Sequence, residues 1–359
     1  MSSFTWFQPL PRKTLVWPSW AQRVGARLLP VPPPPAQGAH PDPLDPATPP
    51  SDPQSWPKEW HDAFASPEME WFRDSLRLPG IADVRTAVLD DLSSYSGLTP
   101  DQCVERCRNW ETWSFEEWFA ADRSDLDGLT NFFQTTESWA FDLLWYAYLQ
   151  TAGCAYPYSL LALRAVADYG GGHGRAHLDF GSGAGVTSQL FARAGYETTL
   201  ADVSTSLLDF ARYRFSRREE TARFIDLSNE KLETSRYDVI TALDSLMHVP
   251  NLAEVVADLH SALRPGGYLI ANFDVRASSP DSAWFLYDDD IEFRAILLRT
   301  GFVPAGRFGA YTAYRRVDPA TTSQQFRMLF DRLVLTSRPR RVVHSQRRRL
   351  ATAIRGKAA

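Results

Sequence analysis

The chain has 359 residues, a formal net charge of -5 and 44% hydrophobic residues. At about 100–200 residues per domain, this length predicts two domains with additional terminal segments. The mild charge points to no particular class of charged partner, and no run of about 18 apolar residues offers a membrane-spanning helix. The opening residues, MSSFTWFQPLPRK, lack the charged start and apolar core of a signal peptide, so we expect a cytoplasmic protein without a membrane partner.

The chain contains three cysteines, Cys103, Cys107 and Cys154, which are too few for a disulfide framework. Cys103 and Cys107 are spaced to share one helix face, but no further cysteine or histidine stands nearby at ligand spacing. We therefore expect buried thiols in a reducing compartment and no metal site.

The first 57 residues are dominated by proline, most densely over 29–57. Proline fixes φ and removes a backbone donor, so neither helix nor sheet is expected there. The composition favours an extended arm of polyproline II character over residues 1–57. A partner with an aromatic groove is one reading of this arm, and a loosely packed spacer is the other.

Residues 58–150 form a second compositional region: eleven of the twelve tryptophans precede residue 151, and seven of them lie in this region. Apolar residues recur there at helical spacing, at Trp139, Leu143, Tyr146 and Leu149. Ser114 followed by Glu117 is typical of a capping box, which predicts that a helix begins at Ser114. We expect a mainly helical, acidic region.

Residues 151–317 alternate short apolar stretches with helical ones, which predicts parallel β-strands joined by helices. The expected strands are AHLDF, ETTLADV, ARFI, YDVITAL and GYLIANF. The expected helices are GVTSQLFARAG, ended by Gly195, then SLLDFARYRFSRR and the segment 252–263. Residues 318–359 then turn basic and form a predicted helix or tail.

A glycine-rich loop, GSGAG at 181–185, lies between the first strand and the first helix. Glycines there permit a tight turn and let a ligand approach the backbone. Asp202 ends the next strand 21 residues after the first glycine (202 − 181 = 21), where a carboxylate can accept from ribose hydroxyls. The glycine spacing differs from the dinucleotide fingerprint, and no lysine-serine follows, so a P-loop is excluded.

Four segments in this order resemble the class I S-adenosylmethionine (SAM) dependent methyltransferases: LDFGSGAG, ADVS, YDVITALDSLMHVPN and LRPGGYLIANF. The resemblance covers about half of the chain and implies a Rossmann-like α/β fold with SAM at the carboxyl ends of the strands. It implies a seven-stranded sheet with one antiparallel strand, whose last two strands come from TGFVPAGRFGAYTAYRRV. The N-terminal Trp-rich region resembles no family.

The resemblance also implies a set of cofactor-binding residues: Asp179, Gly181, Ser182, Gly183, Gly185, Asp202, Val203, Asp226, Leu227 and Asp244. The glycines would line the methionine and sugar, and Asp179 would orient their loop through backbone amides. Asp202 would bind the ribose or cap the helix that follows it. Asp226 would accept from the adenine amino group.

Three residues are candidates for catalysis: His248, Asp244 and Tyr156. The resemblance places Asp244 and Ser245 facing the donor methyl, and a histidine one helical turn later has the chemistry of a general base. A structural role for His248 is the alternative. Tyr156 and Tyr158, beside Pro157, are expected to shape an acceptor pocket, with a place in the helical core as the alternative.

The favoured function is methyl transfer from SAM to a small-molecule acceptor in specialised metabolism, with the Trp-rich region as its lid. The second hypothesis is an RNA or protein methyltransferase recruited by the basic tail. The sequence LDSLM after the fourth strand differs from the Asn-Pro-Pro-Tyr type of motif and disfavours an amino methyltransferase of that type. The third hypothesis is a SAM-binding module without turnover, and the oligomeric state stays open.

Overall fold

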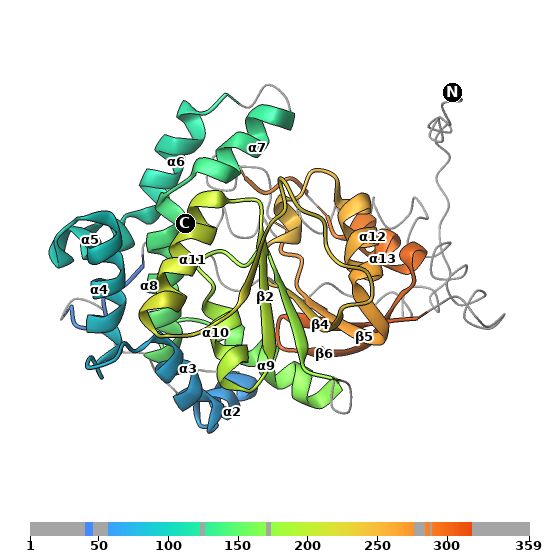
Figure 1. The fold of residues 1–359 in the computed structure, drawn as a ribbon, viewed down its shortest axis with the longest axis horizontal. Helices are drawn as coiled ribbons and strands as arrows, with labels where there is room; N and C mark the ends of the chain where they lie inside the picture. Colours follow the sequence, from blue (N-terminus) through green and yellow to red (C-terminus); the bar gives the residue numbers. More distant parts are fainter. Residues whose placement is uncertain are drawn as a thin grey trace, which may run out of the picture.

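The computed structural model describes residues 40–45, 57–122, 126–169, 174–275, 284–287 and 289–317. Its centre is a seven-stranded sheet of order β3-β2-β1-β4-β5-β7-β6 (Figure 1). The strands are β1 (Ala176–Phe180), β2 (Glu197–Asp202), β3 (Arg223–Asp226), β4 (Tyr237–Ala242), β5 (Leu263–Ala271), β6 (Phe302–Phe308) and β7 (Tyr311–Arg316). Strands β1 to β5 pair in parallel, and β7 is antiparallel to β5 and β6, which confirms the predicted sheet.

Helices cover both faces of this sheet, which is why its strands read as continuous apolar runs. The covering helices are α9 (Tyr158–Tyr169), α10 (Val186–Arg193), α11 (Thr205–Arg217), α12 (Leu252–Ala262) and α13 (Ile291–Thr300). Val239 and Ile270 share one core with α9 and α10, whereas their neighbours Ile240 and Leu269 share another with α12 and α13. Figure 1 shows α12 and α13 on the side of the sheet opposite α10.

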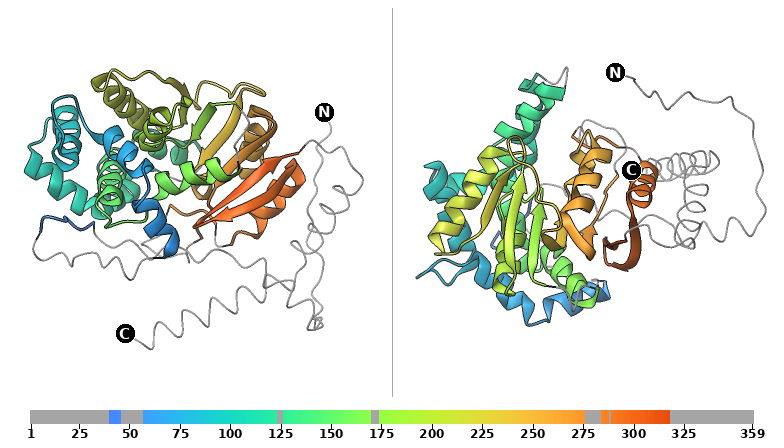
Figure 2. Two further views of the ribbon diagram at one scale, coloured as in Figure 1. Left: turned by 90° about the horizontal axis from the view of Figure 1, so that it is seen from below. Right: turned by 45° about the vertical axis from the view of Figure 1, so that its right-hand side comes forward.

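The Trp-rich region folds as seven helices within the described residues. They are α2 (Lys58–Phe64), α3 (Glu68–Leu76), α4 (Val84–Ser96), α5 (Pro100–Arg108), α6 (Trp110–Ala120), α7 (Leu126–Thr135) and α8 (Ser138–Thr151). Helices α3, α4, α7 and α8 pack on α10 and α11, so this region forms a further layer beside the sheet (Figure 2). The expectation of a mainly helical region is confirmed.

The predicted helix start at Ser114 is wrong. Helix α6 begins at Trp110 after the N-cap Asn109, so Ser114 lies buried inside the helix. Its hydroxyl contacts the Ser138 hydroxyl at 2.8 Å. The Glu117 carboxylate reaches the first turn of α8, where it accepts from the Ser138 N–H at 3.2 Å. The motif therefore joins α6 to α8, because Ser114 and Glu117 bind groups of Ser138 instead of capping the backbone of their own helix.

A buried ionic cluster joins the helical region to the sheet domain. Asp91 of α4 is fully buried and pairs with Arg214 of α11, with the half-buried Arg217, and with Arg218, the C-cap of that helix. Burial lowers the pKa of Arg214 to about 10. This cluster supplies Asp91 with the partners that a buried carboxylate requires.

Most of the Pro-rich arm and all of the basic tail lie outside the described residues. The described piece of the arm, residues 40–45, packs against the helical region, where the Trp145 indole donates to the Pro41 carbonyl at 3.1 Å. Among the described residues, no helix is long and apolar enough to cross a membrane. In the same part of the chain, no three His, Cys, Asp or Glu side chains are grouped so that they could hold a metal ion. Cys103 and Cys107 are buried free thiols, as expected.

Candidate active site

A cavity of about 630 Å³ opens at the carboxyl ends of β1, β2, β3 and β4. The loops that follow these strands form one side of it, and α6, α7, α8 and residues 284–285 form the other. The strand order reverses between β1 and β4, the place where open α/β sheets hold their ligands.

The glycine loop forms the floor of the cavity. Gly181 and Gly183 have φ of 67° and 51°, values that favour glycine. A Cβ on Gly181 would stand 2.4 Å from the Ser245 Cβ, and one on Gly183 would stand 2.6 Å from Leu143. The loop therefore exposes bare backbone to the cavity.

Gly185 has a different place from its two neighbours. It is the N-cap of α10 with φ of 74°, and it does not line the cavity. A Cβ there would meet Leu200 at 2.8 Å, so this glycine lets α10 approach the sheet. Its predicted contact with a ligand has no support in the cavity lining.

Asp202 ends β2 inside the cavity wall and is buried. Its carboxylate accepts from the Gly183 N–H at 2.8 Å and from the Ser204 N–H at 2.9 Å. Burial raises the pKa of Asp202, while these backbone donors oppose the shift. Asp202 thus orients the glycine loop from the position predicted for the ribose ligand.

Asp179 belongs to a buried polar chain beneath the loop. Its carboxylate accepts from the Ser188 and Thr241 hydroxyls at 2.9 and 2.8 Å, and Thr241 also contacts the His177 ring at 2.8 Å. Burial raises the pKa of Asp179 to about 7 and lowers that of His177 to about 3. The Ser188 and Thr241 hydroxyls and the Ser188 backbone hold Asp179, in place of the expected amides of the glycine loop.

The β3 loop separates the two residues predicted to bind adenine. Leu227 lines the cavity together with Val203, whereas Asp226 does not. The Asp226 carboxylate accepts from the Ser228 N–H at 2.9 Å and from the Asn229 amide at 2.7 Å. Asp226 shapes the loop that carries Leu227 to the cavity.

Asp244 and Ser245 follow β4 in the cavity wall, as predicted. Asp244 has φ of 48°, a left-handed conformation that is uncommon for residues other than glycine. Asn272, at the end of β5, holds it: its side-chain oxygen accepts from the Asp244 N–H at 2.8 Å, and its amide donates to the carboxylate. Sequence reasoning missed Asn272, although it lies at the end of the strand beside β4.

His248 lies in the 3-10 turn Leu246–His248, not on an α-helix, and lines the cavity. Its Nδ1 is 2.8 Å from the Trp284 carbonyl, which accepts only, so Nδ1 carries the proton. The second ring nitrogen then holds a lone pair in the neutral ring. This is the form that a general base needs.

Of the two candidate tyrosines, only one lines the cavity. Tyr158 begins α9, is buried and lines the cavity. Tyr156 does not line the cavity; its hydroxyl accepts from the Ala310 N–H at 2.7 Å, at the β6–β7 turn. Burial raises the pKa of Tyr156 to about 12. These contacts favour a structural role for Tyr156.

The helical region and residues 284–285 line the cavity with an aromatic chamber, and the sequence predicted a Trp-rich lid without most of its individual residues. Its lining includes the residues Trp110, Phe133, Trp139, Tyr146, Trp284 and Phe285. Trp110, Phe133 and Trp284 belong to one buried cluster although they lie up to 174 positions apart (284 − 110 = 174). No local pattern announces contacts of that separation.

The cavity fits SAM at its glycine-loop end. The loop backbone and Asp202 lie there, and among the described residues the buried Ser182 hydroxyl has no hydrogen-bond partner. A buried hydroxyl without a partner is costly, and a polar ligand beside it would remove that cost. Asp244 faces the same cavity from the other strand.

The strand order, the glycine loop and Asp202 together define a class I, Rossmann-like methyltransferase domain. Residues 178–269 match the family model described as "Methyltransferase domain". The chain therefore carries a class I SAM-dependent methyltransferase domain, and the resemblance seen in its motifs is confirmed.

Curated relatives match about a third of the chain. A ubiquinone biosynthesis O-methyltransferase of Alkalilimnicola ehrlichii is 34% identical over 119 residues, 32% of this chain and 47% of that protein. One of Proteus mirabilis is 29% identical over 138 residues, 38% of this chain and 55% of that protein. A highly reducing polyketide synthase of Strobilurus tenacellus is 31% identical over 161 residues, 35% of this chain and 6% of that protein. The chain spans about half the length of the O-methyltransferases it matches.

Solved structures of other proteins superpose on part of this chain. A phosphoethanolamine N-methyltransferase 2 of Haemonchus contortus with SAM covers 49% of this chain and 44% of that chain, at 18% identity and a TM-score of 0.40. A 1,6-didemethyltoxoflavin N1-methyltransferase of Burkholderia thailandensis covers 44% of this chain and 77% of that chain, at 21% identity and a TM-score of 0.35.

Proposed function

We propose that the chain is a SAM-dependent methyltransferase whose acceptor is a small molecule enclosed between the glycine loop and helices α6, α7 and α8. One observation carries the proposal: a single cavity is lined by the glycine loop, by Asp202 and by the aromatic chamber. A donor and an acceptor held side by side in one cavity meet the main requirement of methyl transfer, which is their alignment.

SAM supplies an activated methyl group on a sulfonium, so the chain has only to align the acceptor and keep water out. Asp202 would hold the ribose hydroxyls while the loop amides hold its carboxylate in place. The chamber aromatics would exclude water from the acceptor. Where the acceptor must lose a proton, His248 would accept it, because its Nδ1–H is directed to the Trp284 carbonyl.

A small acceptor in specialised metabolism is part of this proposal. The partial match to a polyketide synthase and the matches to ubiquinone O-methyltransferases support it. The cavity is also poorly suited to nucleic acid, since seven carboxylates and one lysine are among its lining side chains: Glu111, Asp142, Asp179, Asp202, Glu230, Asp244, Asp258 and Lys231.

Calorimetry with SAM and S-adenosylhomocysteine (SAH) tests the donor half of the proposal. Asp202→Ala should weaken binding of both by about 1–3 kcal/mol, because cofactor hydroxyls and loop amides lose their partner. Asp209→Ala, which removes an exposed carboxylate on α11, is the matched control and should bind as the parent does. A folded parent protein that binds neither compound would refute the proposal.

The acceptor half is tested by isotopic transfer. The protein is incubated with methyl-labelled SAM and a cell extract separated into RNA, protein and low-mass fractions. Label in the low-mass fraction is the expected result. Label confined to RNA or protein would instead support a macromolecular substrate, and binding of SAM without any transfer would support a module without turnover.

A further inference from the structure

One wall of the aromatic chamber contains a histidine–carboxylate pair contributed by two distant segments. His40, from the segment 40–45, is only 3% exposed, and its Nε2 lies 2.5 Å from Oδ1 of Asp142 on α8. The His40 ring also stacks on Trp110 and Tyr146, at centroid distances of 5.5 and 5.6 Å. Asp142, Trp110 and Tyr146 line the cavity, so His40 supports the chamber wall from behind.

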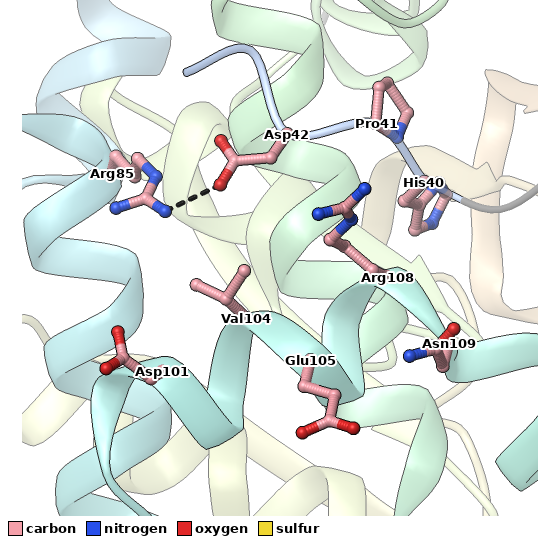
Figure 3. Close-up of a pocket in the computed structure, with 9 residues that line it drawn as sticks. All are labelled: His40, Pro41, Asp42, Arg85, Asp101, Val104, Glu105, Arg108 and Asn109. Atoms are coloured by element: carbon pink, nitrogen blue, oxygen red, sulfur yellow. Dashed lines mark hydrogen bonds and ion pairs between the residues drawn. The ribbon is translucent and has the colours of Figure 1, made fainter. Parts of the chain in front are cut away.

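The segment 40–45 is anchored so that His40 has a defined place. Asp42 pairs with Arg85 of α4 at 2.7 Å, and Figure 3 shows these two side chains directed toward each other. Asp45 pairs with Arg108 of α5 at 3.0 Å, and Trp145 of α8 donates to the Pro41 carbonyl. Three helices therefore hold the segment, and a segment used only as a spacer would not need such anchoring.

The charge of the chamber limits what it can hold. Asp142 and Asp244 both raise the pKa of the buried Tyr146, after burial itself, so both carboxylates act on the chamber. The one lysine among the lining residues, Lys231, lies on the loop after β3, beside Leu232. Like charges brought together in such a site cost several kcal/mol, so an anionic acceptor is strongly disfavoured.

Trp110 gives an independent sign of a ligand. This residue lines the chamber with only 9% of its surface exposed, and its indole N–H has no hydrogen-bond partner among the described residues. Buried indole N–H groups usually find an acceptor. A ligand oxygen would supply one here.

We propose that Asp142, held in place by His40, anchors the acceptor, and that the chamber takes an aromatic, oxygen-bearing molecule with a cationic or neutral hydrogen-bond donor. This inference rests on the proposed function and names the acceptor class of the same cavity. Asp142 gives one carboxylate oxygen to His40 and the other to the acceptor's donor. His40 is a positioning residue, because it acts through Asp142.

Three phenols with matched rings test the proposal by calorimetry on the protein–SAH complex: tyramine, tyrosol and 4-hydroxyphenylacetate. They carry an ammonium, a hydroxyl and a carboxylate, and each offers a phenolic oxygen to Trp110. We expect tyramine to bind at least about tenfold more tightly than 4-hydroxyphenylacetate. A charge-assisted hydrogen bond changes the dissociation constant by about this factor. Asp142→Asn should abolish this preference, while Asp209→Asn, on the exposed face of α11, should keep it.

Two substitutions of His40 separate positioning from packing. His40→Gln retains a donor near Asp142, whereas His40→Phe retains the ring between Trp110 and Tyr146 and loses the donor. The tyramine preference should survive in His40→Gln and fall in His40→Phe, with SAH affinity unchanged in both. Loss of the preference in His40→Gln with its survival in His40→Phe would mean that His40 only packs.

The outcomes also separate this inference from the proposed function. Parent protein that fails to bind SAH refutes the proposed function. Parent protein that binds SAH but none of the phenols, or that binds the carboxylate as tightly as the amine, refutes only the role of Asp142. A preference for tyramine that persists in Asp142→Asn refutes it as well.

Discussion

The two sides of the cavity are built in different ways. On the sheet side, backbone geometry and short motifs place each group: Gly181 needs its positive φ, and Asp202 is held by amides 19 and 2 residues away. On the helical side, the wall depends on side-chain contacts between distant segments, such as His40 with Asp142, 102 residues apart. The sheet side, which would hold the methyl donor, is therefore fixed by the fold. The helical side, which would hold the acceptor, can change by substitution of side chains.

The largest expected effect comes from breaking the joint between the two sides. Asp91→Ala leaves Arg214 and Arg218 buried without their carboxylate and should lower the free energy of unfolding by about 3–5 kcal/mol. The neighbouring Asp90, which is partly exposed and pairs with Arg217, is the control. Asp90→Ala should cost less than about 1 kcal/mol. Equal losses in urea unfolding would show that burial of the cluster contributes nothing.

The second prediction concerns the buried chain under the glycine loop, in which two titrations oppose each other. Asp179, with its pKa raised from 3.8 to about 7, stabilises the fold fully below about pH 4, and this contribution is lost as the pH rises to about 7. His177, with its pKa lowered from 6.5 to about 3, stabilises the fold above pH 6.5, and this contribution is lost as the pH falls. Between about pH 4 and 6.5 the two contributions change the free energy of unfolding with pH in opposite directions and cancel.

Asp179→Asn should remove the opposing titration, so that the free energy of unfolding follows pH as His177 alone dictates. Acidification from pH 6.5 to 4.5 should then destabilise the variant more than the parent, by up to about 1.4 kcal/mol per pH unit, or about 3 kcal/mol in total. Urea unfolding at the two pH values measures the difference. Asp209→Asn, at an exposed carboxylate, should follow the parent. A variant with the same pH dependence as the parent would mean that one of the two groups is not titrating as its burial implies.

The third prediction tests whether the sheet side depends on bare backbone. Gly181→Ala and Gly80→Ala both place a side chain at positive φ, a cost of about 1–2 kcal/mol. Only Gly181 adds a collision, with the Ser245 Cβ, since nothing lies within 4 Å of a Cβ on Gly80. Gly181→Ala should therefore be less stable than Gly80→Ala and should lose SAH binding, which Gly80→Ala keeps. Equal stability and binding would contradict the role of the loop.

The sequence predicted the sheet side well because its signals are local. The first two strands, the glycine loop and Asp202 stand within about 30 positions of one another, and each has a backbone reason for its place. Asn272 was missed because its partner, Asp244, follows another strand, 28 positions earlier in the chain. His40 and Asp142 were missed for the same reason, since no periodicity links a residue in a Pro-rich arm to the middle of a helix.

The Ser114–Glu117 pattern shows how a local signal fails on the helical side, and it gives the smallest expected effect. Glu117 accepts from the Ser138 hydroxyl at 2.6 Å and from the N–H groups of Glu137 and Ser138 at 3.3 and 3.2 Å. It acts as a cap for α8, supplied from α6, and no side-chain cap comes from Glu137 at the N-cap position.

Glu117→Ala should therefore cost about 1 kcal/mol in urea unfolding, the usual loss for a removed N-cap. Glu116→Ala, one position away on the exposed face of α6, should stay within about 0.5 kcal/mol of the parent. Because α8 carries Asp142, Glu117→Ala should also weaken tyramine binding to the SAH complex while leaving SAH affinity unchanged. An equal loss of SAH affinity would mean that the two sides of the cavity are not built independently.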